Sequence, residues 1–166
     1  SGGLGTMGYG LPAAVGVQIA HPDKLVIDIA GEASVLMTMQ EMSTAVQYKL
    51  PIKIFILNNQ YMGMVRQWQE LLHEKNYSES YTAALPDFVK LAEAYGCVGI
   101  QATKPDELDE KINEMINTKE PVIFDCRVDP AENCFPMIPS GKPHNQMLLG
   151  PEDEKEEVSD EGKTLV

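Results

Sequence analysis

The chain has 166 residues, 43% of them hydrophobic, which is the size and composition of one globular domain with its own core. Its formal net charge of −12 argues against a nucleic-acid partner, because phosphate backbones are bound by clustered lysines and arginines. No apolar run approaches the roughly 18 residues of a membrane-spanning helix. Three cysteines without CxxC spacing favour a reducing compartment. We therefore expect no nucleic-acid or membrane partner and a cytoplasmic location, with an organelle left open.

The apolar pattern predicts strands that alternate with helices. After a glycine-rich loop over 1–10, we expect helices at 11–20, 35–48, 60–72, 87–95 and 105–117, and strands at 25–30, 52–57, 97–101 and 121–128. Each predicted strand is apolar almost throughout, as strands buried in a parallel sheet are. The expected fold class is α/β, a doubly wound, mostly parallel sheet with helices on both faces. Residues 1–150 should form one domain, and the acidic run 151–166 a disordered tail.

The glycine-rich run Gly3-Leu4-Gly5-Thr6-Met7-Gly8 matches the G-x-G-x-x-G fingerprint of dinucleotide sites. Asp28 follows it at about 20 residues, the separation at which a ribose-binding acid is found. The fingerprint should follow a strand, however, and the sequence offers none before it. Asp28 also lies inside a predicted strand and not at its end. A dinucleotide site is therefore the weaker alternative.

Two neighbouring predicted strands are followed by polar residues. Glu32 comes directly after Gly31 and strand 25–30, and Asn58-Asn59 ends strand 52–57. If these strands pair, a carboxylate and a carboxamide meet at one sheet edge, and Mg²⁺ prefers such hard oxygen ligands together with phosphate oxygens. A helix that starts near Ser34, which could cap it, would turn its N–H groups toward the same place and favour an anion. The residues suggest a Mg²⁺–diphosphate site; two unrelated strand-end turns are the alternative.

The stretch GEASVLMTMQEMSTAVQYKLPIKIFILNN resembles the thiamine-diphosphate motif, which begins Gly-Asp-Gly and ends Asn-Asn. SGGLGTMGYGLPAAVG, LNNQYMGMVRQWQ and CFPMIPSG resemble, more narrowly, the catalytic large subunit of acetohydroxyacid synthase (acetolactate synthase). The resemblance runs from Gly2 to about Leu149 and implies the carboxy-terminal thiamine-diphosphate-binding domain of that enzyme. The chain opens Ser-Gly-Gly without an initiator Met, so we expect a fragment, and the resemblance implies that the amino-terminal pyrimidine-binding and middle domains are absent from it.

The resemblance also implies roles for single residues. The metal ligands would be the side chains of Glu32 and Asn59 and the backbone carbonyl of Tyr61. The cofactor-binding positions would be Gly5, Met7, Gly31, Ala33, Ser34, Asn59, Met62 and Gly63. Among them Met7 would be the apolar wedge that bends the cofactor. The substrate and inhibitor channel would be lined by Met64, Val65, Trp68 and Ser140.

Glu32 is the main departure from the family, which usually has Asp at this position. Glutamate adds one methylene and moves the carboxylate by about 1.5 Å when extended. Mg²⁺ demands near-ideal octahedral geometry at about 2.0–2.1 Å, so the change is not neutral. Either the turn relaxes and Glu32 still binds the metal, or the metal binds more weakly.

The resemblance implies an enzyme that condenses two pyruvates, or pyruvate with 2-ketobutyrate, with loss of CO₂, in the biosynthesis of isoleucine, valine and leucine. Thiamine diphosphate and Mg²⁺ would be its cofactors here, with FAD bound by an absent domain. Its partners would be 2-keto acids, the missing domains, further copies in a homo-oligomer and a regulatory subunit. The activating glutamate belongs to an absent domain, so this chain should hold no catalytic residue and be inactive alone. Another thiamine-diphosphate-dependent carboligase or decarboxylase, or a non-catalytic assembly domain, stays open.

Overall fold

The computed structural model describes residues 5–82 and 84–151, so the expected acidic tail, apart from Pro151, lies outside the described residues. The chain divides into two compact units. Residues 1–60 with 83–130 make up the first, which we call the sheet unit. Residues 61–82 with 131–166 make up the second, which we call the α4 unit.

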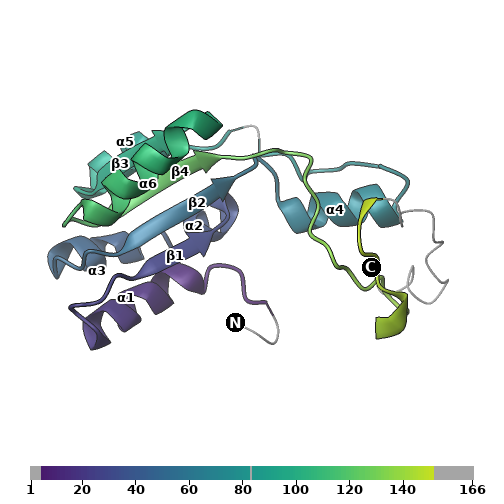
Figure 1. Ribbon diagram of the computed structural model, residues 1–166, viewed down its shortest axis with the longest axis horizontal. Helices are drawn as coiled ribbons and strands as arrows, with labels where there is room; N and C mark the ends of the chain where they lie inside the picture. Colours follow the sequence, from purple (N-terminus) through teal and green to yellow (C-terminus); the bar gives the residue numbers. More distant parts are fainter. Residues whose placement is uncertain (1–4, 83, 152–166) are drawn as a thin grey trace. The chain divides into compact units, whose positions relative to one another are not determined.

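Four parallel strands form the sheet, in the order β1-β2-β4-β3 (Figure 1). Their bounds are β1 (Ile27–Ala30), β2 (Lys53–Asn58), β3 (Val98–Ala102) and β4 (Val122–Arg127). In the register Ala30 lies opposite Ile56, and Asp125 lies opposite both Ile56 and Gln101. The expected parallel sheet is confirmed, because each apolar run of the sequence forms one strand.

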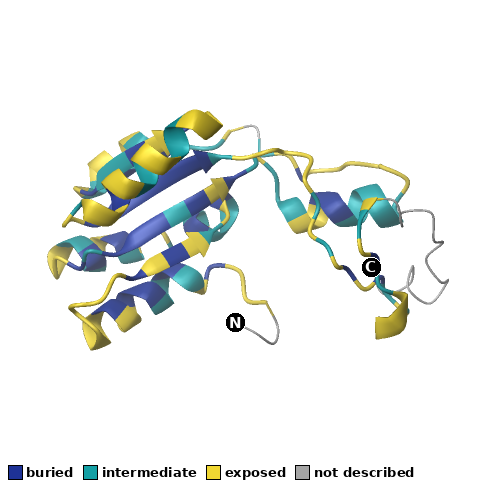
Figure 2. Ribbon diagram, viewed as in Figure 1, coloured by how far each residue is buried: buried dark blue, intermediate teal, exposed yellow. Residues whose placement is uncertain are grey.

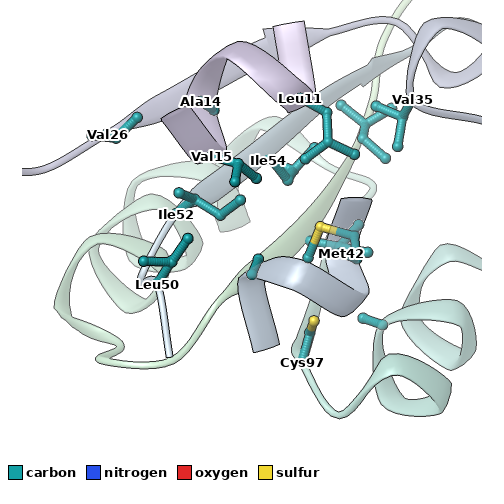
Figure 3. Packing of buried hydrophobic residues seen from close by; sticks show 14 of the residues in the cluster. Leu11, Ala14, Val15, Val26, Val35, Met42, Leu50, Ile52, Ile54 and Cys97 are labelled. Atoms are coloured by element: carbon teal, nitrogen blue, oxygen red, sulfur yellow. The ribbon is translucent and has the colours of Figure 1, made fainter. Parts of the chain in front are cut away.

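Helices cover both faces of this sheet, as expected from the alternating pattern. They are α1 (Gly10–Ala20), α2 (Glu32–Thr38), α3 (Glu41–Gln47), α5 (Phe88–Tyr95) and α6 (Leu108–Asn117), with a 3₁₀ turn η1 (Pro105–Glu107) before α6. The strand side chains alternate between two cores. Ile54 and Ile56 of β2 belong to a core with residues of α1, α2, α3 and α5, whereas Phe55 packs with residues of α6, β3 and β4. Figure 3 shows Ile54 in the first of these cores. Residues of four helices therefore form one core with the sheet, whereas, within the described part of this unit, α6 alone covers the other face, mainly over β3 and β4.

The edge strand β1 is less buried than its apolar sequence predicts. Ile27 is 40% exposed and Ile29 is 69% exposed, whereas Ile54 and Ile56 of the neighbouring strand are fully buried. Figure 2 shows exposed stretches in yellow on β1. The core on the α6 side is made by residues of β3 and β4, with Phe55 at its margin. The prediction of a fully buried strand at 25–30 was wrong on this face, because no helix of the sheet unit's described residues packs over it.

The helix predicted at 35–48 is two helices. Between α2 and α3 the N–H of Met42 donates to the Met39 carbonyl, and the N–H of Ser43 donates to the Gln40 carbonyl. These bonds reach back three residues, so the chain tightens into a 3₁₀ turn at Met39–Gln40. The prediction that Ser34 caps the helix was also wrong. Gly31 occupies the N-cap position of α2, and Ser34 lies inside its first turn.

The α4 unit is built around α4 (Gly63–Leu72), with the short 3₁₀ turn η2 (His144–Gln146) farther along the chain. Isolated antiparallel bridges join Tyr61 to Tyr81 and Met137 to Leu148. The helix predicted from residue 60 begins at Gly63 instead. None of the helices in the described part of the chain is both long and apolar enough to cross a membrane.

Candidate functional site

Glu32 and Asn59 follow directly on two strands that pair with each other. β1 and β2 run parallel, with Ala30 opposite Ile56, so the residues after both strands leave the same edge of the sheet. Glu32 is the first residue of α2 and is 1% exposed, and Asn59 follows the last residue of β2. The strand pairing on which the sequence-based metal site depended is therefore present.

The glycine-rich loop before α1 is fixed to α2 through the backbone N–H and the backbone carbonyl of Gly8. The N–H of Gly8 donates to Ser34 Oγ at 2.9 Å, and its carbonyl accepts from Thr38 Oγ1 at 3.0 Å. Gly8 has φ +85°, and a Cβ at this position would lie 3.1 Å from the Cβ of Met37. A larger residue here would thus be strained both by its backbone conformation and by its packing. Ser34 and Thr38 hold the loop that carries Met7, whose side chain is 44% exposed, against the first two turns of α2.

Asp28 is not placed where a ribose-binding acid would have to lie. It is 8% exposed within β1, and a Cβ on Gly10 would lie 2.2 Å from its Oδ1, so the carboxylate faces the start of α1. Its Oδ2 is buried without a hydrogen-bond partner among the described residues, and burial raises the pKa of the Asp28 carboxyl. The acid on which the dinucleotide alternative depended is therefore enclosed within the fold.

A polar network next to Asn59 escaped the sequence reasoning. Asp125 of β4 is 1% exposed and accepts hydrogen bonds from Asn58 Nδ2 at 2.7 Å and Gln101 Nε2 at 2.8 Å. Arg127 Nε lies 3.4 Å from Asp125 Oδ2. The side-chain oxygen of Asn58 accepts from the N–H of Gln60 at 3.2 Å. An aspartate in the middle of the apolar run PVIFDCRV was the sequence signal that could have revealed it.

Three of the four predicted channel residues come together in the α4 unit. Met64, Val65 and Trp68 line a pocket of about 770 Å³, together with Gln69, Leu72, His73, Glu74 and Asn76. Ser140, half-buried, is not among its lining residues. The four apolar lining residues all belong to α4, and the four polar ones are Gln69 of the same helix and three residues that follow it. Ligand pockets commonly combine apolar walls with a few polar groups in this way.

The residues just before α4 use part of their backbone within their own unit. Met62 is the N-cap of α4, and its N–H donates to the Ser80 carbonyl at 2.9 Å. The Met62 carbonyl accepts from the N–H of Arg66. The N–H of Met62 is therefore engaged in this conformation. Of the two other predicted positions in this segment, Tyr61 lies in the bridge to Tyr81, and Gly63 is the first residue of α4.

No cluster of three or more His, Cys, Asp or Glu side chains that could hold a metal occurs between residues 5 and 151, leaving aside 83. A metal near Glu32 and Asn59 would therefore take its remaining ligands from backbone carbonyls, water or a bound ligand. Mg²⁺ commonly binds in this way, through one or two carboxylates and substrate phosphates, and not in an all-protein cage.

Residues 1–126 match a protein-family model described as thiamine pyrophosphate enzyme, C-terminal TPP binding domain. The chain belongs to this family. It is 53% identical over 149 residues to the acetolactate synthase large subunit of Cyanidium caldarium, which covers 89% of the chain and 26% of that protein. It is 47% identical to the large subunit of Haemophilus influenzae (93% and 27%) and 49% identical to the mitochondrial catalytic subunit of Saccharomyces cerevisiae (95% and 23%). The chain thus spans about a quarter of the length of these relatives.

Among solved structures, a thiamine diphosphate-dependent 4-hydroxybenzoylformate decarboxylase of Rhodococcus jostii RHA1 matches with a TM-score of 0.70. The match is 32% identical and covers 76% of this chain and 24% of that one. The fold class and the resemblance to acetolactate synthases are both confirmed, and the family makes thiamine diphosphate the cofactor of this domain.

Proposed function

We propose that this chain is the cofactor-binding domain of an acetolactate synthase catalytic subunit. The whole enzyme would condense two pyruvates, or pyruvate with 2-ketobutyrate, with loss of CO₂. The observation that carries the proposal is the parallel pairing of β1 and β2, which puts Glu32 and Asn59 at one sheet edge in a chain about half identical to acetolactate synthases. The decarboxylase match, at 32% identity, makes another member of the superfamily the second candidate.

The chemistry of the donors fits a magnesium–diphosphate group. Glu32 offers a carboxylate and Asn59 a carboxamide, both hard oxygen ligands, and Tyr61 would add its backbone carbonyl. Backbone and hydroxyl groups of Gly31, Ala33, Ser34 and Gly63 would hold the diphosphate. Ser34 Oγ already accepts from Gly8, which leaves its own hydrogen to donate.

The other predicted residues would bind and orient the organic parts. Gly5 and Met7 would contact the pyrimidine ring of the cofactor, with Met7 as an apolar wedge. Met64, Val65 and Trp68 would form the wall past which the 2-keto acid enters. When bound, thiamine diphosphate supplies the electron sink for decarboxylation, and the protein supplies binding, orientation and electrostatics. FAD, a homo-oligomer, a regulatory subunit and a cytoplasmic location remain predictions for the whole enzyme.

Calorimetric titration of thiamine diphosphate into the 166-residue chain, with and without Mg²⁺, tests this function. We expect binding that requires Mg²⁺, tighter binding in Glu32→Asp because aspartate shortens the ligand arm, and weaker Mg²⁺-dependent binding in Glu32→Gln because the carboxylate is lost. Glu41→Asp, at the matching first position of α3, is the control and should leave the affinity unchanged. Failure of both folded wild type and Glu32→Asp to bind would favour the alternative of a non-catalytic assembly domain. Pyruvate-dependent formation of acetolactate by the chain alone would contradict the expectation that its activating glutamate lies elsewhere.

A further inference from the structure

Asp125 is the fourth of the six residues of β4, the strand between β2 and β3, and its carboxylate is buried. Burial of an ionised carboxylate is costly unless hydrogen bonds satisfy its oxygens. Here Asn58 satisfies Oδ1, while Gln101 and Arg127 approach Oδ2. Asn58, which donates to this carboxylate, directly precedes the candidate metal ligand Asn59. A role in holding the turn at 58–60 would explain why the buried carboxylate is present.

We propose that Asp125 is a positioning residue for the turn that carries Asn59, and that it acts through the side chain of Asn58. The inference rests on the proposed function of Asn59 as a metal ligand. An ionised carboxylate only accepts hydrogen bonds, so it draws the NH₂ group of Asn58 toward itself. The Asn58 oxygen must then point the other way, where it accepts from the N–H of Gln60. Asp125 thereby sets the orientation of the amide, and the amide sets the turn.

The turn needs such support because its backbone is unfavourable. Gln60 has φ +62°, in the left-handed region that residues with a Cβ seldom adopt. Such a residue persists where its surroundings hold it. Asn58 holds it from the side chain, and the Asn58 carbonyl, which accepts from the N–H of Val128, fixes the chain just before it. Asn59 lies between the anchored residue and the strained one, so its direction depends on both.

Amide hydrogen exchange of Gln60 in the cofactor-free chain tests the positioning directly. In Asp125→Asn the carboxylate is replaced by a neutral group of the same shape, and we expect the Gln60 amide to exchange about tenfold faster, since a charge-assisted hydrogen bond is roughly twice as strong as a neutral one. The Lys53 amide, bonded to the Val26 carbonyl at the other end of β2, is the internal reference and should not change. Unchanged Gln60 exchange in a folded Asp125→Asn sample would overturn the inference.

Titration of Mg²⁺ with thiamine diphosphate connects the turn to the site. Asp125→Asn should weaken binding by about tenfold or more, the range found when an outer partner of a metal ligand is removed. Gln101→Leu removes the other hydrogen bond to Asp125 without touching Asn58, and should weaken binding less. Adding Gln60→Gly to Asp125→Asn should recover part of the affinity, because glycine adopts the left-handed conformation without strain.

The two measurements separate the possible failures. If the wild-type chain does not bind the cofactor, the proposed function fails, while the exchange of Gln60 still shows whether Asp125 holds the turn. Equal weakening by Asp125→Asn and Gln101→Leu, or no recovery with Gln60→Gly, would show that Asp125 only stabilises the sheet, and would overturn its positioning role. If Asp125→Asn does not fold, Asn58→Ser is the second variant, with the same expected acceleration at Gln60.

Discussion

The two compact units of this chain are stabilised in different ways. In the sheet unit, strand and helix side chains such as Ile54, Met42 and Phe124 are completely buried and touch mainly other apolar groups. In the α4 unit the most buried side chains of the helix are Arg66 and Gln67, at 4% and 1% exposed. Apolar burial is tolerant of direction, whereas hydrogen bonds are not. The sheet unit is thus stabilised mainly by apolar burial, whereas α4 is held within its own unit mainly by directional hydrogen bonds.

Arg66 and Gln67 both bind the irregular segment that begins at Ala131. Arg66 pairs with Glu70 and donates to the carbonyls of Ala131 and Glu132 at 3.1 and 3.0 Å. Gln67 donates to the Cys134 carbonyl at 3.0 Å and accepts from the Cys134 N–H at 2.7 Å. A segment without helix or strand has few backbone partners of its own, so these side chains supply them. The pocket residues Met64, Val65 and Trp68 belong to the same helix, so the hydrogen bonds of Arg66 and Gln67 also fix the helix that carries them.

The largest effect should come from emptying the apolar core. Ile54→Ala removes a fully buried side chain of β2 and should lower the free energy of unfolding by about 3 to 4 kcal/mol through lost burial and a residual cavity. Urea unfolding followed by circular dichroism measures the change. Cys97 lies in the same core and its pKa is raised to about 11 by burial, so its thiol should react only as this unit opens.

A matched variant tests whether burial is the cause. Ile29→Ala removes the same side chain from β1, where it is 69% exposed, and should change the free energy of unfolding by less than about 0.5 kcal/mol. A loss in Ile29→Ala as large as that in Ile54→Ala would show that strand propensity, and not burial, stabilises the sheet unit.

A smaller effect is expected in the α4 unit. Arg66→Met removes the hydrogen bonds that the guanidinium donates to the carbonyls of Ala131 and Glu132 and should cost about 2 to 3 kcal/mol. Because the loss is local, limited proteolysis should cut the 131–149 segment faster while labelling of Cys97 stays slow. Lys111→Met removes an ion pair whose two side chains are 34% and 46% exposed, and should be close to neutral. Faster labelling of Cys97 in Arg66→Met would mean that the two units unfold together.

The smallest effect should be a stabilisation that depends on pH. Burial raises the pKa of the Asp28 carboxyl above 3.8, so the folded state binds its proton more tightly than the unfolded state does. The charged carboxylate therefore costs stability above the folded pKa, and this cost falls as the pH drops toward 3.8 and vanishes below it. Asp28→Asn should raise the melting temperature at pH 7 and lose that advantage in acid. A gain that persists below pH 3.8 would point to packing instead of charge.

Much of the sheet could be predicted because its information is local. Every residue of the run IKIFIL except Lys53 is apolar, so both faces of the strand carry apolar side chains, and turns bound the run on either side. Lys53 itself is buried, and its Nζ donates to the carbonyls of Thr118 and Glu120 at 2.6 and 2.8 Å. No local pattern indicates that partnership, because it joins residues far apart in the sequence.

The failures have the same origin. The 3₁₀ turn at Met39–Gln40 contains no glycine or proline, so the sequence pattern reads as one helix. Ser34 is a good capping residue by type, but its hydroxyl is engaged by Gly8, 26 residues away in the chain. The hydrogen bond from Asn58 to Asp125 forms only when β4 lies beside β2, and the sequence of neither strand indicates that they are neighbours. Residue types predicted the donors of the site; contacts between distant segments decide how they are held.

The place of β4 in the sheet also affects how the chain is made. β4 is the last of the four described strands in chain order, yet it is the neighbour of both β2 and β3. Until Arg127 has emerged, β3 has no strand to pair with, and β2 offers one open edge. Such edges are where a nascent chain joins other chains by mistake. During synthesis, β1 and β2 can pair early, but this sheet can be completed only after β4 has also been made.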